Sequence, residues 1–151
     1  MTNDNILRMS EAPSKKEIDE KLKSSLDLLY QHDSHLLKED LDEISISHRL
    51  ALYLQQKFDA WHVDCEYNRN LGDTKRIDNK PVRPDIIIHR RGTTDNLIAI
   101  EIKKLSSNPA DDNDDKKKLE GYKSGIGYQH AIFLKIGTGS KDCGKYSFTY
   151  V

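Results

Sequence analysis

Cysteine is scarce in this chain of 151 residues: Cys65 and Cys143 stand far apart, and no Cys-x-x-Cys spacing occurs. Two such residues cannot hold a four-cysteine iron–sulfur cluster, and a zinc centre built from cysteine and histidine is not expected. The sequence also lacks a signal peptide and a long hydrophobic run. We therefore expect a reduced, cytoplasmic protein with no membrane partner.

The chain also has no large excess of charge of one sign, because it contains 24 lysines and arginines and 25 aspartates and glutamates. This near-neutral total neither favours nor excludes nucleic acid, since the distribution of the charges decides such binding. Apolar residues make up 36% of the chain and charged residues 32%, which predicts one domain with a modest core.

Two strongly apolar segments are consecutive in the chain. Residues 86–88 and 98–102 are rich in isoleucine, which favours β-strands, and the polar residues between them are typical of a hairpin turn. Asp85 lies at the start of the first strand, and Glu101 and Lys103 lie at the end of the second. Side chains alternate along a strand, so Glu101 and Lys103 share one face. Two carboxylates and a lysine are therefore expected to converge where the strands meet.

This grouping suits a divalent metal ion and a phosphodiester. Mg²⁺ prefers oxygen ligands, which the carboxylates of Asp85 and Glu101 and the backbone carbonyl of Ile102 would supply. The metal lowers the pKa of a bound water, and Lys103 would orient that water or stabilise the transition state. The alternative is a solvated strand face, on which glutamate and lysine form only a weak ion pair. The nearly continuous apolar character of both strands favours the metal site, because it indicates strands covered on both faces.

The residues Pro84-Asp85, followed by Glu101-Ile102-Lys103, resemble the PD-(D/E)XK motif of the restriction-endonuclease-like nuclease superfamily. From about Leu36 onward, the predicted order of elements is also similar to the core of that family (αβββαβ). The resemblance implies that Asp85 and Glu101 bind Mg²⁺ or Mn²⁺, that Lys103 assists the water, and that the substrate is DNA or, less often, RNA. Compact members often dimerise, so a homodimer is one expected assembly.

Glu43 is a fourth candidate for the active site, because some members of this superfamily carry a further carboxylate on the first core helix. Its spacing from the apolar residues that follow places it on the inward stripe of a helix predicted over residues 36–58. A carboxylate that continues an apolar stripe is unusual unless it is paired or bound to metal. Glu43 could equally be stabilised by its position near the helix N-terminus, or by an ion pair with His48 or Arg49.

Basic residues bracket the predicted site and are candidates for contacts with nucleic acid. Such residues hold phosphates through counterion release, although an ordinary solvated loop would have the same composition. The predicted contacts are Arg69, Lys75, Arg76, Arg83 and Lys104.

The remaining elements follow from periodicity and capping residues. Residues 1–13 are polar and are expected to be disordered, and Ser14 with Glu17 predicts a capping box. Residues 14–151 are predicted to form a single domain, with an accessory helix over 14–33 and the core over 35–151. Within the core we predict strands over 61–69, 130–136 and 145–151, a helix over 115–123, a polar loop over 71–82 and a flexible acidic tract over 106–115.

The predicted fold is therefore α/β: a central mixed sheet flanked by helices, with a restriction-endonuclease-like core and an extra N-terminal helix. The predicted function is divalent-metal-dependent hydrolysis of phosphodiester bonds in DNA. Two alternatives stay open: a catalytically silent nucleic-acid-binding module on the same fold, and a protein-interaction partner in a defence or mobile-element system. The intact set of Asp85, Glu101 and Lys103 argues against the silent module.

Overall fold

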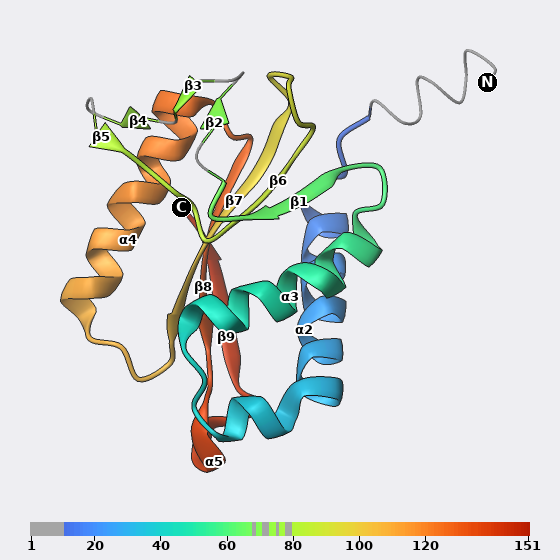
Figure 1. Cartoon of the computed structure of the whole chain (residues 1–151), viewed down its shortest axis with the longest axis vertical. Coiled ribbons are helices and arrows are strands. Elements are labelled where there is room, and N and C mark those ends of the chain that lie inside the picture. The colour runs from blue at the N-terminus through green and yellow to red at the C-terminus, as the bar shows by residue number, and fades with distance from the viewer. Residues whose placement is uncertain (1–10, 68, 71–72, 75, 78–79) are drawn as a thin grey trace.

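The computed structural model describes residues 11–67, 69–70, 73–74, 76–77 and 80–151. They form an α/β fold in which helices flank a five-stranded mixed sheet, as predicted (Figure 1). The strand order is β1-β6-β7-β8-β9; β7 and β8 are parallel, and the other neighbouring pairs are antiparallel. The predicted disorder of residues 1–13 falls mostly outside the described residues.

The strands of the main sheet are β1 (His62–Cys65), β6 (Ile86–His89), β7 (Asn96–Lys104), β8 (His130–Ile136) and β9 (Tyr146–Tyr150). Between β1 and β6 lie two small strand pairs: β2 (Arg69–Asn70) with β3 (Asp73–Thr74), and β4 (Arg76–Ile77) with β5 (Lys80–Pro81). The helices are α2 (Lys15–Lys38), α3 (Glu43–Lys57), α4 (Pro109–Gly121), the π-helical turn η1 (Tyr122–Ile126) and α5 (Gly139–Asp142). The predicted hairpin of β6 and β7 is confirmed, whereas the polar loop predicted over 71–82 contains the short strands β3, β4 and β5.

The end predicted for the accessory helix, at residue 33, coincides with a kink within α2. Ser14 does cap α2, since its side chain accepts the Glu17 N–H at 3.2 Å. Asp33 leaves helical geometry, and a second helical segment continues α2 from this kink to Lys38. The Asp33 carboxylate is anchored by the Tyr53 hydroxyl at 2.6 Å, which explains how a polar residue sits at a kink inside the helix. The first core helix therefore begins later than predicted, at the first residue of α3.

The prediction of a flexible acidic tract over residues 106–115 is wrong, because most of this tract forms the first turns of α4. The Asn108 side chain caps this helix by accepting the Asp111 N–H at 2.9 Å, and Pro109 occupies the first turn. Aspartates in a first turn interact favourably with the positive end of the helix dipole. A composition that is typical of loops is thus also suited to the start of a helix, because its aspartates lie in the first turn.

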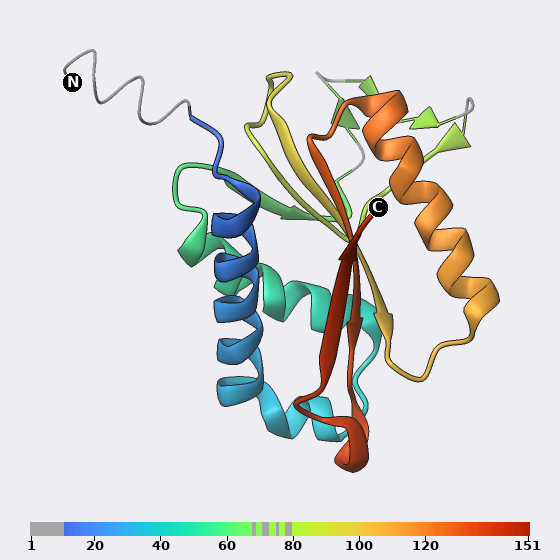
Figure 2. The same ribbon diagram turned by 180° about the vertical axis from the view of Figure 1, so that it is seen from behind.

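The sheet is buried on both faces by different helices. α2 and α3 cover one face, and α4 covers the other (Figure 1); Figure 2 shows β9 at the edge of the sheet between α2 and α4. Ile86 and Ile88 pack in the cluster beneath α2 and α3, whereas Ile87 packs with Leu119 and Tyr122 beneath α4 and η1. This alternation explains why β6 has no exposed residue. Among the described residues, no helix combines the length and apolar character needed to cross a membrane.

Two leucines of α3 test this layering. Leu50 is fully buried, whereas Leu52 is 53% exposed on the same helix. We expect Leu50→Ala to lower the free energy of unfolding by about 2–5 kcal/mol, because it leaves a cavity against the sheet. Leu52→Ala should change it by less than about 0.5 kcal/mol. Urea denaturation of both variants measures the difference, and equal losses would contradict the assignment of the buried face.

Candidate active site

The antiparallel register of β6 and β7 brings the two predicted carboxylates together. Ile86 pairs with Ile100, so one further step along both strands places Asp85 opposite Glu101. Side chains in such opposed positions share a face and lie within contact distance. A hydrogen bond joins the two carboxyl groups, and the Ile102 N–H donates to Asp85 Oδ2 at 2.7 Å. The structure therefore forms the predicted pair at the end of the hairpin.

Burial makes this pair hold protons more tightly than free carboxyl groups do. Glu101 is only 4% exposed, and burial followed by the negative charge of Asp85 raises the pKa of Glu101 well above its ordinary value. Burial also raises the pKa of Asp85, although the hydrogen bonds from Glu101 and Ile102 oppose the shift. Two carboxylates this close, here buried Glu101 and half-buried Asp85, repel each other unless a proton or a cation lies between them.

Lys103 supplies the positive charge next to the pair. Its Nζ lies 3.4 Å from Asp115 Oδ2 and 4.0 Å from Glu43 Oε1. Burial alone would lower the pKa of Lys103, but the charges of Asp115 and Glu43 outweigh that effect and raise it. Lys103 is therefore an ammonium at neutral pH, ready to face an anion.

Glu43 lies beside the site, at the first position of α3. Its Oε2 accepts the Lys104 N–H at 3.1 Å, which links α3 to the end of β7. The favourable position at a helix N-terminus is confirmed, whereas the ion pair with Arg49 is wrong, because Arg49 binds Asp33. Glu43 thus contacts Lys103 and Lys104, and among the described residues no hydrogen bond or ion pair joins it to Asp85 or Glu101.

Two residues of the site escaped prediction from the sequence. The Tyr122 hydroxyl donates to Glu101 Oε1 at 2.8 Å, and burial together with Glu101 raises the pKa of Tyr122, so the hydroxyl stays a donor. Asp115 binds Lys103 from the same helical segment. The one sequence feature they share is their seven-residue spacing, which places both on one helix face together with Leu119. That spacing alone does not distinguish a site from a packed core.

The donor set fits a hard divalent cation. Asp85 and Glu101 offer carboxylate oxygens, and the Ile102 carbonyl projects to the same side of β7 as its N–H, toward Asp85. Within the described ranges, no group of three or more histidine, cysteine, aspartate or glutamate side chains is arranged to hold a metal alone. A cation at this pair would complete its shell with water and substrate oxygens, as Mg²⁺ commonly does.

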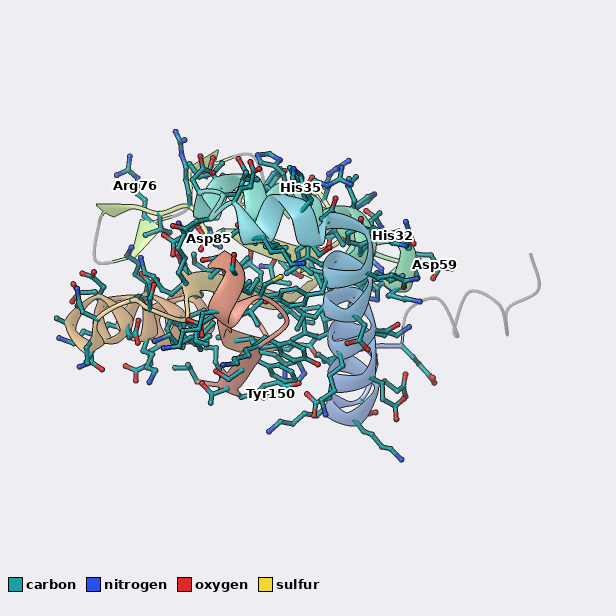
Figure 3. All side chains as sticks on the ribbon, turned by 90° about the horizontal axis from the view of Figure 1, so that it is seen from below. His32, His35, Asp59, Arg76, Asp85 and Tyr150 are labelled. Carbon is teal, nitrogen blue, oxygen red and sulfur yellow. The ribbon has the colours of Figure 1, made fainter. Side chains whose placement is uncertain are left out.

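An open hollow of about 300 Å³ lies beside Lys103, and Asp85 and Glu101 are not among the residues that line it. Its walls come from the starts of α3 and α4 and the end of β7: Asp42, Glu43, Lys103, Lys104, Ser106, Ser107 and Asp111. The hollow is lined by charged and hydroxyl groups, which suits a polar, hydrated ligand. Asp85 lies between α3 and α4 in the view of Figure 3.

The residues predicted to contact nucleic acid do not all lie near the acidic pair. Arg76 and Arg83 are exposed, and Figure 3 shows Arg76 out on the strand-pair segment, away from Asp85. Lys104 is paired with Asp40 at 3.1 Å. The side chain of Arg69 and the whole of Lys75 lie outside the described residues. The structure therefore groups Lys104 with the site and leaves Arg76 on the periphery.

Comparison with known protein families, with characterised proteins and with solved structures finds no match for this chain.

The raised pKa of Glu101 predicts a pH-dependent stability. The folded protein keeps a proton that the unfolded chain loses, so this contribution is complete below about pH 4 and is lost as the pH rises through the folded-state pKa. We expect Glu101→Gln, which cannot ionise, to gain stability relative to the parent protein as the pH rises from acid to neutral. Urea denaturation at several pH values checks this expectation. Glu120→Gln on the exposed face of α4 is the control, and a pH-independent difference for Glu101→Gln would contradict the assignment.

Proposed function

We propose that the protein is a divalent-metal-dependent nuclease with a restriction-endonuclease-like core, which hydrolyses phosphodiester bonds in DNA. The observation that carries this proposal is the convergence of Asp85, Glu101 and Lys103 at the end of the β6–β7 hairpin. A largely buried acidic pair with an adjacent ammonium matches the needs of phosphodiester hydrolysis, which places a cation and a positive charge around the same phosphate.

The proposed roles follow from the contacts of each side chain. Asp85, Glu101 and the Ile102 carbonyl would hold Mg²⁺ or Mn²⁺, which, when bound, supplies an activated water and neutralises phosphate charge. The Ile102 N–H fixes Asp85, and the Tyr122 hydroxyl fixes Glu101. Lys103 offers its ammonium to the water or the phosphate. Glu43 supports this end of the site by holding the backbone of Lys104.

The order of elements also supports the proposal. Apart from the short strands β2 to β5 and the turn η1 that lie between them, α3, β1, β6, β7, α4 and β8 occur in the order expected for the αβββαβ core, and α2 is the extra N-terminal helix. Among the basic residues, Lys104 next to the hollow and exposed Arg83 are the proposed phosphate contacts. A homodimer, and DNA rather than RNA as substrate, stay predictions within this proposal.

Nuclease activity is tested directly on supercoiled plasmid DNA, single-stranded DNA and RNA. We expect the parent protein to cleave in Mg²⁺ or Mn²⁺ and to be inactive in EDTA, because the acidic pair needs the cation. Glu101→Gln and Asp85→Asn should each lower the cleavage rate by at least about 100-fold. Gel electrophoresis of time courses gives these rates.

Two exposed residues serve as matched controls for the cleavage assay. Glu120→Gln and Lys117→Ala alter charge on α4 away from the pair, and both should cleave at the parent rate. Cleavage by Glu101→Gln at the parent rate would show that the site is wrongly assigned. Salt-sensitive binding of nucleic acid without any cleavage would favour the silent binding module. Absence of both would favour the protein-interaction partner.

Metal binding is measurable without any substrate. At a Mn²⁺ concentration of about 100 times the dissociation constant, binding to the folded state adds about 2.7 kcal/mol of stability. For a chain of this size we expect the melting temperature of the parent protein to rise by roughly 5–10 °C. Glu101→Gln should show a much smaller rise in the same thermal scan. Equal shifts in both proteins would place the cation elsewhere.

A further inference from the structure

α4 carries two ion pairs of the same kind side by side. Lys103 of β7 and Lys135 of β8 are directly opposite each other in the parallel register. Like charges in such positions destabilise a sheet unless they are compensated. Asp112 Oδ2 lies 2.7 Å from Lys135 Nζ, and Asp115 Oδ2 lies 3.4 Å from Lys103 Nζ. The two pairs share their chemistry and their helix, but only the second lies beside the acidic pair.

The Asp115 carboxylate is buried, and the residue is only 4% exposed. Burying a carboxylate is costly unless it is paired, and here Lys103 and Lys118 pair it from two sides, the latter at 3.5 Å. In the described part of the chain, no ion pair within 4.0 Å connects Lys103 to Asp85 or Glu101. The ammonium is therefore drawn toward α4 and away from the carboxylates that would receive the cation.

We propose that Asp115 is a positioning residue, which holds the Lys103 ammonium apart from Asp85 and Glu101. The inference rests on the proposed nuclease function and deepens it by adding a residue that keeps the site open. Without Asp115, the ammonium would turn to the remaining carboxylates on its side of the sheet. Glu43 Oε2 accepts the Lys104 N–H, and its Oε1 lies 4.0 Å from Lys103 Nζ, so Asp115 at 3.4 Å is the nearer of the two carboxylates that hold the ammonium.

Such a rearrangement would damage the site in two ways. An ammonium paired with Asp85 or Glu101 competes with a divalent cation for the same oxygens. It also leaves the position from which it could face a phosphate or a water. Positioning groups that act through a neighbouring residue commonly change metal affinity or activity by roughly 10- to 100-fold.

A double-mutant cycle on Mn²⁺ affinity tests the proposal without substrate. Calorimetric titration of the parent protein, Asp115→Asn, Lys103→Gln and the double variant gives four dissociation constants. We expect Asp115→Asn to weaken Mn²⁺ binding by roughly 10-fold, and to change it by less than about twofold when Lys103→Gln is already present. Asp112→Asn, which breaks the matched pair with Lys135, should stay within about twofold of the parent.

Cleavage kinetics provide a second test with the same variants. Asp115→Asn should lower kcat by roughly 10- to 100-fold with little change in KM, and Asp115→Glu should recover part of the loss. Circular dichroism and thermal unfolding of Asp115→Asn and Asp112→Asn verify that both variants are equally folded.

Each outcome of the cycle supports or overturns the positioning role. Equal weakening by Asp115→Asn in both backgrounds would mean that Asp115 acts through its own charge, which would overturn that role. Identical behaviour of Asp115→Asn and Asp112→Asn would overturn it as well. If the parent binds Mn²⁺ at the acidic pair but cleaves no nucleic acid, the nuclease proposal fails while the affinity cycle still tests Asp115. If the parent does not bind Mn²⁺, both proposals fail.

Discussion

The antiparallel register of β6 and β7 is the constraint on which the candidate site depends. Pairing of Ile86 with Ile100 places Asp85 opposite Glu101, and a shift by one residue would turn one carboxylate to the other face. Both faces of these strands are buried, so the isoleucines on one side and the packing of α4 on the other fix the register. The core therefore determines where the chemistry can occur, and the two carboxylates meet because the apolar residues leave no other alignment.

Burying this acidic pair costs stability, and the surrounding contacts show how the fold tolerates it. The Tyr122 hydroxyl and the Ile102 N–H satisfy carboxylate oxygens, while Lys103 supplies a positive charge nearby. A divalent cation would remove the remaining repulsion more completely than a shared proton does. The same feature that weakens the folded protein at neutral pH is thus the feature that would make it bind metal. Such a conflict between stability and local charge is typical of functional sites.

Much of this arrangement could be predicted from the sequence, because it depends on neighbours along the chain. The alternation of isoleucines in 86–88 predicts the strand faces, and the hairpin then brings Asp85 to Glu101. Contacts made by helices were harder to predict, since they depend on how each helix is rotated against the sheet. Asp115 lay in an acidic tract that composition alone assigns to a loop, and Tyr122 had the pattern of a core residue. The end of the accessory helix near Asp33 was predicted, but the Tyr53 hydroxyl that anchors Asp33 there is distant in the sequence and was not.

The central claim is that Asp85 and Glu101 together form a divalent-cation site. Crystals of the protein soaked in Mn²⁺ test it most directly, because the anomalous scattering of manganese locates the ion independently of any assumed activity. We predict an anomalous peak within ligand distance of both carboxylates and of the Ile102 carbonyl. A clear peak elsewhere on the protein, with Asp85 and Glu101 still joined by their hydrogen bond, would contradict the claim.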